Sequence, residues 1–317
     1  MIERKLGAAT RDAYGKTLIE LGKEDPRIIV LDADLSKSTR TDGFGKAYPD
    51  RFIDIGIQEA NLVGIAAGLA SCGKIPFISS FACFLICKGY EQLRMAVAFP
   101  ELNVKVVASH GGISVGEDGA SQQSVEDFAL AGALAGFSVI CPSDEVSTKA
   151  LIRAAAGHKG PVYVRTGRSK APVVHKPGTP FEIGKGVRVK GGKDVTLVAT
   201  GLLVFEALEA ADILKQKNID AGVIDMHTIK PLDRELLLAE VRQSRCAVTA
   251  EEHLIWGGLG AAVSEALAQE LPVPVEFVGL RDTYAESGTP EELFQKYGLT
   301  STHIVHAAEK AVSRKPR

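Results

Sequence analysis

One carboxylic acid lies inside a segment built mostly from residues that folded proteins bury. Residues 54–70 read Asp-Ile-Gly-Ile-Gln-Glu-Ala-Asn-Leu-Val-Gly-Ile-Ala-Ala-Gly-Leu-Ala, and Glu59 is that acid. Because burial disfavours the ionised form of a carboxyl group, such an acid can stay protonated and donate a hydrogen bond to a nitrogen base. Glu59 could equally be an acidic first-turn residue of a helix or half of a salt bridge. This segment alone leaves both interpretations open.

A glycine-rich loop over residues 109–122 carries a second group of polar side chains. It reads Ser-His-Gly-Gly-Ile-Ser-Val-Gly-Glu-Asp-Gly-Ala-Ser-Gln and follows a predicted strand at its carboxyl end, which is where doubly wound sheets bind ligands. His110 can be a cation or a neutral donor, Asp118 can accept hydrogen bonds from hydroxyl groups, and Gln122 can donate and accept. This mixture suits a polyol phosphate, although a surface loop of turn residues would have the same composition.

Two aromatic residues three positions apart, Phe81 and Phe84, follow another predicted strand. Such a pair could clamp a flat heterocycle, whereas core packing is the usual role of phenylalanine. The heterocycle interpretation needs a neighbouring acid that acts on a flat base, and Glu59 is the candidate.

The elements that must position these side chains follow a regular alternation. In the first half, the predicted strands are 27–31, 52–55, 75–79, 104–108, 139–141 and 162–164, and the predicted helices are 10–21, 60–70, 90–98, 124–135 and 146–156. In the second half, the predicted strands are 195–199, 221–225, 247–250 and 275–279, and the predicted helices are 206–217, 233–242, 260–270 and 291–295. Alternation of this kind predicts an α/β fold with mostly parallel sheets and helices on both faces.

Proline and glycine interrupt the pattern over residues 168–192, which is typical of a linker. We therefore expect two doubly wound domains, residues 1–170 and residues 193–317, joined by a linker over residues 171–192.

Composition excludes several classes of function. The net charge of -2 gives no basic field for nucleic acid. The start of the sequence leads into a polar amphipathic stretch without a long apolar core, and no later apolar run reaches the about 18 residues of a membrane span, so neither a signal peptide nor a membrane span is expected. We expect a cytoplasmic protein whose five cysteines are free. Cys83 and Cys87 lack a second cysteine or histidine pair at zinc-site spacing, so no metal site is predicted.

Four motifs give the chain a close resemblance to the second half of transketolase, its pyrimidine-binding domain followed by its C-terminal domain. They are Gly-Ile-Gln-Glu-Ala-Asn at 56–61, Gly-Glu-Asp-Gly-Ala-Ser-Gln at 116–122, Cys-Pro-Ser-Asp at 141–144 and Met-His-Thr-Ile-Lys-Pro-Leu-Asp at 226–233. The resemblance implies that Glu59 hydrogen-bonds the aminopyrimidine ring of thiamine diphosphate as the catalytic acid, that Phe81 and Phe84 line the ring's pocket, and that Asp34 lies beside the cofactor. Cys87 departs from the polar or aromatic residue of some relatives.

The same resemblance implies a substrate site. Arg11, Ser38, His110 and Arg168 match the family's sugar-phosphate anchor, and their side chains are all suited to donate to phosphate oxygens. Asp118 matches an aspartate that contacts a sugar hydroxyl, and Gln122 matches a position that holds histidine or glutamine in the family.

One expected motif is absent. The family binds the diphosphate and magnesium ion of its cofactor through a Gly-Asp-Gly motif, and this sequence has none. The resemblance therefore implies the C-terminal subunit of a split transketolase of the pentose phosphate pathway. An N-terminal partner subunit would hold the magnesium and the diphosphate, in a dimer of heterodimers. Three alternatives stay open: the beta component of a 2-oxo-acid dehydrogenase, a noncatalytic binding module of the same fold, and a nicotinamide enzyme using Gly257-Gly258-Leu259-Gly260, although Val263 breaks that fingerprint.

Overall fold

The computed structural model describes residues 2–315 and contains three β-sheets. The largest has seven strands in the order β12-β6-β7-β5-β4-β2-β3, and every neighbouring pair is parallel except β12 with β6. Its strands are β2 (Ile28–Asp32), β3 (Phe52–Asp54), β4 (Ile75–Ser79), β5 (Lys105–Ala108), β6 (Ser138–Ile140), β7 (Val162–Arg165) and β12 (Thr228–Lys230).

Helices cover both faces of this sheet because its strands alternate between two hydrophobic cores. Leu31 and Ile78 pack in one core, and Val30 and Phe77 pack in the other. The first core is covered by α4 (Glu59–Ser71), α5 (Ala82–Lys88) and α7 (Asp127–Ala133), and the second by α1 (Thr10–Glu24), α3 (Asp42–Ala47) and α8 (Glu145–Gly157). A short helix α2 (Ser36–Thr39) precedes α3, and α6 (Tyr90–Gln92) continues into the π-helical segment η2 (Leu93–Ala98).

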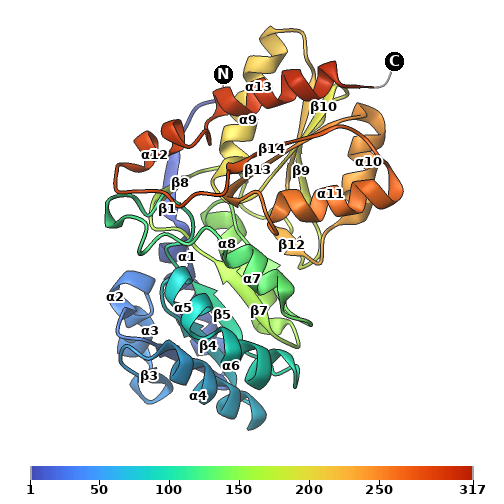
Figure 1. Cartoon of the computed structure of the whole chain (residues 1–317). Coiled ribbons are helices and arrows are strands. Elements are labelled where there is room, and N and C mark those ends of the chain that lie inside the picture. The colour runs from blue at the N-terminus through green and yellow to red at the C-terminus, as the bar shows by residue number, and fades with distance from the viewer. Residues whose placement is uncertain (1, 316–317) are drawn as a thin grey trace.

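A second sheet organises the C-terminal half in the order β14-β13-β10-β11-β9, with only β9 antiparallel to its neighbour. Its strands are β9 (Val187–Lys190), β10 (Val195–Ala199), β11 (Ala221–Asp225), β13 (Ala247–Leu254) and β14 (Val275–Leu280). The accompanying helices are α9 (Leu203–Gln216), α10 (Arg234–Ser244), α11 (Leu259–Glu270), α12 (Pro290–Lys296) and α13 (Ser301–Ser313). Figure 1 shows this domain above the N-terminal one. The predicted α/β fold class with two mostly parallel sheets is confirmed.

The two halves are more interwoven than the sequence suggests. β12 follows the C-terminal strand β11 along the chain, yet it pairs with β6 and completes the N-terminal sheet. Near the start of the chain, Arg4 pairs at 2.6 Å with Glu206 of α9. The chain then enters β1 (Leu6–Ala9), which pairs with β8 (Lys170–Pro172).

The predicted linker is more ordered than its proline and glycine content indicates. β8 overlaps its start, and β9 forms the edge of the second sheet near its end. The sequence analysis missed both strands, together with α5 and α13. All five cysteines are free thiols, and within residues 2–315 no helix is long and apolar enough to cross a membrane.

Candidate active site

The predicted site residues lie at one edge of the seven-stranded sheet, where its parallel strands end. Glu59 begins α4 after β3, Phe81 follows β4, His110 follows β5, and Arg168 follows β7. The strand order reverses around β2, which has β3 on one side and β4 on the other, and doubly wound sheets bind ligands at such a crevice. The fold therefore gathers residues that are far apart in the sequence.

Glu59 is buried, but it is not the lone acid that the sequence indicated. Its side chain is only 2% exposed, and its Oε1 accepts a hydrogen bond of 3.2 Å from the hydroxyl of Ser80. The ammonium of Lys88, at the end of α5, lies 3.4 Å from Oε2. Glu59 therefore forms a salt bridge, and its partner Lys88 has a side chain that is itself 52% exposed.

An aromatic stack runs beside this carboxyl group. The rings of Phe81 and Phe84 are 5.6 Å apart and nearly parallel, at 16°. Phe81 also stacks on the imidazole of His110 at 3.7 Å. Phe81 is buried, whereas Phe84 is only partly buried and has the Lys88 ammonium 4.5 Å from its ring centre. The stack therefore connects the surroundings of Glu59 with those of His110.

Asp32, at the end of β2, was missed by the sequence analysis. It is fully buried and accepts hydrogen bonds from the backbone N–H of Leu35 and from the hydroxyls of Thr39 and Thr41, all at 2.7–2.8 Å. Burial raises the pKa of this carboxyl group. The loop that it holds carries two predicted residues: Asp34, which is exposed, and Ser38, which is partly buried. An acid at a strand end followed by hydroxyl residues is the signal that could have identified it.

The fold brings Arg11, Ser38 and His110 together. A guanidinium nitrogen of Arg11 donates to the backbone oxygen of Ser38 at 2.9 Å and lies 3.4 Å from Nε2 of His110. The other ring nitrogen of His110 is 2.8 Å from the Ser109 hydroxyl. Burial, together with the charges of Arg11, Arg168 and Arg40, lowers the pKa of His110 to about 3. His110 is therefore a neutral hydrogen-bonding group at pH 7, and the positive charge comes from the arginines.

Arg168 contacts the glycine-rich loop from the end of β7. It donates to Glu117 at 3.0 Å and to the backbone oxygen of Val115, and it lies 4.0 Å from Asp118. Asp118 is exposed and Gln122 is partly buried, with the Gln122 amide oxygen bonded to the Ser121 hydroxyl. The loop thus presents its polar groups next to a cation.

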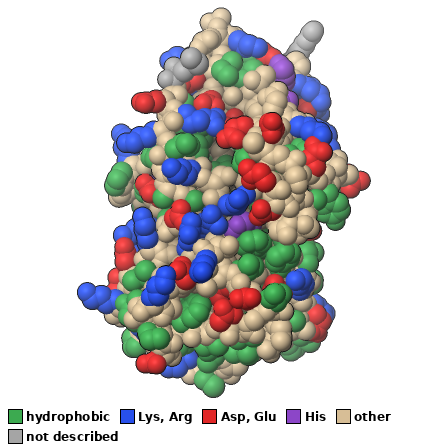
Figure 2. Space-filling view, turned by 90° about the vertical axis from the view of Figure 1, so that its left-hand side faces the viewer, with side chains coloured by type: hydrophobic (Ala, Val, Ile, Leu, Met, Phe, Trp, Pro, Cys, Tyr) green, Lys and Arg blue, Asp and Glu red, His purple; other side chains and the backbone are tan. Residues whose placement is uncertain are grey.

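Arg40 is a further cation that sequence reasoning missed. It follows α2 with a left-handed backbone (φ 70°) and donates to Asp12 at 2.6 Å. Burial lowers the pKa of Arg11, and the positive charge of Arg40 lowers it further. Arg40 stands in Ser-Lys-Ser-Thr-Arg, which has no helical or strand period to mark it. Figure 2 shows Lys and Arg side chains gathered beside a histidine near the middle of one face.

The C-terminal half supports the glycine-rich loop. Gly119 has a φ of 77°, and a Cβ atom there would lie 2.6 Å from the Ser287 hydroxyl, so only glycine fits. Gln123 donates to the backbone oxygen of Glu286 at 3.0 Å. The position of Asp118 therefore depends on contact between the two domains.

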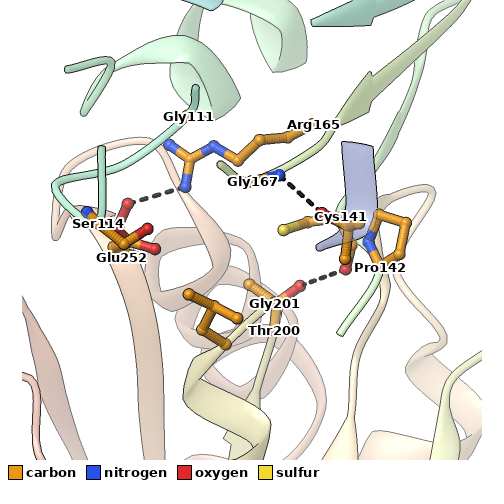
Figure 3. A pocket seen from close by; sticks show the side chains of 11 residues that line it. Gly111, Ser114, Cys141, Pro142, Arg165, Gly167, Thr200, Gly201 and Glu252 are labelled. Carbon is orange, nitrogen blue, oxygen red and sulfur yellow. Dashed lines mark hydrogen bonds between the residues drawn. The ribbon is translucent and has the colours of Figure 1, made fainter. Parts of the chain in front are cut away.

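A separate cavity between the domains is too small to be the site. It is lined by Arg165, Glu252, Ser114 and Cys141 among others (Figure 3). Its volume of about 20 Å³ has room for only one water molecule. Arg165 donates to the backbone oxygen of Glu252 at 2.8 Å and pairs with buried Asp127. This region joins the domains.

The Gly257-Gly258-Leu259-Gly260 turn is occupied by the protein itself. The backbone N–H groups of Leu259 and Gly260 each donate to the buried carboxylate of Glu251 at 2.7 Å. A dinucleotide would need these donors for its phosphates, so the turn does not fit the nicotinamide alternative.

The residues fit one end of thiamine diphosphate. A buried carboxyl group beside stacked rings suits the aminopyrimidine, because the carboxyl can hydrogen-bond ring nitrogen while the rings contact its faces. In the part of the chain that the structure describes, no group of three or more His, Cys, Asp or Glu side chains could hold a metal ion.

Comparison with known proteins extends over both domains. A family model described as "Transketolase, pyrimidine binding domain" matches residues 7–173, and one described as "Transketolase, C-terminal domain" matches residues 184–304. A Methanocaldococcus jannaschii protein named as a transketolase C-terminal section is 46% identical over 93% of this chain and 93% of its own. The 6-deoxy-6-sulfo-D-fructose transketolase subunit SqwH of Clostridium sp. is 40% identical over 96% of this chain and 95% of its own.

A full-length relative and a solved structure are also similar to this chain. Homo sapiens transketolase is 38% identical over 96% of this chain but only 49% of its own length, so this chain spans about half of that protein. A solved structure described as "Split gene transketolase, inactive beta4 tetramer" is 50% identical, with a TM-score of 0.92 over 98% of this chain and 100% of its own.

Proposed function

This chain belongs to the transketolase family, and from that premise we propose that it is the C-terminal subunit of a split, thiamine diphosphate-dependent transketolase. The proposed reaction transfers a two-carbon ketol unit from a ketose phosphate to an aldose phosphate. The observation that supports it best is the position of buried Glu59, which lies beside an aromatic stack at the same sheet edge as three arginines.

Glu59 and its neighbours form the proposed site for the aminopyrimidine ring of the cofactor. Glu59, held by Ser80, donates a hydrogen bond to the aminopyrimidine ring and tunes its basicity. Phe81 and Phe84 line the ring, and Asp34 lies near the cofactor at the subunit contact. When bound, thiamine diphosphate supplies the nucleophilic carbon that carries the ketol unit.

The substrate site is proposed at the cationic group. Arg11 and Arg168 bind the sugar phosphate as charged donors, and Ser38 and His110 add neutral hydrogen bonds. Asp118 and Gln122 contact sugar hydroxyls. Arg40 joins this set because its charge acts on Arg11 and His110.

The donor sugar stays open between pentose phosphates and specialised ketoses. One relative is named as a 6-deoxy-6-sulfo-D-fructose transketolase subunit and another as an apulose-4-phosphate transketolase subunit. Sulfonate and phosphate groups are both anions that arginine binds, so the cationic group suits either. A cytoplasmic location also belongs to the proposal, since five free cysteines suit a reducing compartment.

A second polypeptide completes the proposed enzyme. Full-length Homo sapiens transketolase is about twice as long as the region it shares with this chain. We assign the diphosphate and magnesium sites to an N-terminal partner subunit, and the active assembly to a dimer of heterodimers.

A reconstitution assay tests this function. Purified chain is mixed with the candidate N-terminal subunit, thiamine diphosphate and magnesium, and ketol transfer is measured with each component left out in turn. Activity that needs both chains and the cofactor supports the proposal. Decarboxylation of a 2-oxo acid instead would indicate the dehydrogenase beta component, and inactivity with a verified partner complex would indicate a noncatalytic module.

A further inference from the structure

Lys88 makes two contacts that converge on the region proposed for the aminopyrimidine. Its ammonium lies 3.4 Å from Oε2 of Glu59 and 4.5 Å from the centre of the Phe84 ring. A carboxyl oxygen and an aromatic face are the two features that the aminopyrimidine ring needs in the proposed function. In this chain, the Lys88 ammonium contacts both the Glu59 carboxyl group and the face of the Phe84 ring.

The backbone around Lys88 is held tightly while its side chain is not. Gly89 is buried, and a Cβ atom there would lie 2.8 Å from the backbone oxygen of Leu85 and 3.5 Å from that of Glu59. The end of α5 is therefore packed directly against the start of α4. The Lys88 side chain, by contrast, is 52% exposed and ends a flexible four-carbon stem. It can turn into solvent without moving either helix.

We propose that Lys88 is a placeholder for the aminopyrimidine ring: it occupies Glu59 and the Phe84 face before the cofactor binds, and the cofactor displaces it. This inference rests on the proposed function. Lys88 is a positioning residue, because it acts through Glu59 rather than on the substrate. Its contact keeps a buried carboxylate paired while no cofactor is present, which avoids leaving an unpaired charge at the site.

The strength of the contact decides the size of the effect. An ion pair with one exposed partner contributes only a few tenths to about 1 kcal/mol, which corresponds to about two- to fivefold in an equilibrium constant. Lys88 can therefore be displaced by a ligand that stacks and hydrogen-bonds, yet its removal should be measurable.

Calorimetric titration of thiamine diphosphate with magnesium into the complex of this chain and its N-terminal partner tests the proposal. Lys88→Met keeps the length of the side chain and removes its charge, so we expect cofactor binding to tighten by about two- to fivefold. Lys88→Arg retains a cation and should stay closer to wild type. Lys46→Met is the matched control, because Lys46 forms an exposed pair with Asp42 on α3.

The Glu59→Gln background separates a positioning role from a general effect of charge. There, Lys88→Met should change cofactor affinity less, because the carboxylate that pairs with Lys88 is gone and only its contact with the Phe84 ring remains. Unchanged or weaker binding by Lys88→Met in the wild-type background, or an equally large effect in the Glu59→Gln background, would overturn the proposal. If the wild-type complex bound no thiamine diphosphate, the proposed function itself would fail together with this inference, whereas normal wild-type binding with no response to Lys88→Met would reject the inference alone.

Discussion

Two buried carboxylates of the N-terminal domain, Asp127 and Glu59, are paired in opposite ways. Asp127 and its partner Arg165 are both buried, with side chains 0% and 4% exposed. Asp127 also accepts from Tyr163 at 2.6 Å, and Arg165 donates onward to the backbone oxygens of Glu252 and Ser124. Burial alone would raise the pKa of Asp127, but the charge and hydrogen bonds of Arg165 outweigh burial and lower it.

Glu59 has a different environment. It has one hydroxyl donor and one cation, and that cation is half exposed. Burial of an acid therefore does not by itself indicate a ligand site. The two acids differ in the exposure of their partners: Lys88 is 52% exposed and Arg165 is 4% exposed. A saturated pair such as Asp127–Arg165 joins parts of the fold, whereas a pair with an exchangeable partner is suited to bind a ligand.

The largest predicted effect is on the saturated pair. Asp127→Ala leaves the Arg165 guanidinium buried without its partner, which should cost about 3–5 kcal/mol of unfolding free energy. Urea denaturation measures this change, with Asp42→Ala at an exposed pair as control. A loss no larger than that of the control would show that the Asp127 pair is not structural.

Glu59→Gln should lower turnover strongly and the free energy of unfolding only slightly. The amide keeps the shape but cannot share a proton with the cofactor, so turnover of the reconstituted enzyme should fall by about 10²-fold or more. The unfolding free energy should change by less than about 1 kcal/mol, since the lost ion pair has an exposed partner. Steady-state kinetics and urea denaturation on the same preparation check both halves. Turnover like that of wild type would contradict the proposed role.

The cationic group should affect substrate affinity rather than stability. Arg168→Ala removes charged hydrogen bonds worth about 1.5–3 kcal/mol, which should raise KM for phosphorylated sugars about tenfold or more and leave unphosphorylated donors nearly unchanged. Arg40→Ala should show a smaller change in the same direction, because in the proposal Arg40 contributes through its charge on Arg11 and His110. Arg27→Ala, at the opposite end of β2, is the control. Equal effects on both sugar classes would reject the phosphate role.

The smallest predicted effect is a pH dependence at the domain junction. Nε2 of buried His175 lies 2.7 Å from Asp225. Burial alone would lower the pKa of His175, but the hydrogen bond and charge of Asp225, with the charge of Asp144, raise it. The stabilisation is therefore complete below the unfolded pKa of about 6.5 and is lost as pH rises through the folded pKa.

His175→Gln should remove this dependence. The difference in unfolding free energy between wild type and the variant should shrink as pH rises above about 6.5, measured by urea denaturation at a series of pH values. A difference that grows with pH would contradict the assignment.

The sequence predicted the strands best where both faces are buried. β4, β10 and β11 match their predicted bounds, because each is a short run that is buried at every position. β12 could not be predicted, since its three residues find their partner in β6, far earlier in the chain. The strands β8 and β9 in the predicted linker were missed for the same reason. They form by pairing with β1 and β11, and their own composition gives no strand signal.

Some residues of the candidate site could be identified from the sequence, and others could not. Glu59, Phe81 and His110 stand in segments with recognisable chemistry, and the family resemblance added Arg168; the fold gathers all four at one edge of the sheet. Lys88 and Arg40 carry no motif, because their importance comes from tertiary structure: Lys88 lies beside a buried acid, and the charge of Arg40 acts on Arg11 and His110. Their contacts follow from tertiary packing and not from local sequence.

The structure of the assembled two-chain complex with thiamine diphosphate is the most direct test of the central claim. We expect the Glu59 carboxyl group within hydrogen-bonding distance of the aminopyrimidine ring, with Lys88 displaced and the diphosphate held by the partner subunit. A Glu59 side chain turned away from the cofactor, or a diphosphate bound by this chain, would contradict the claim.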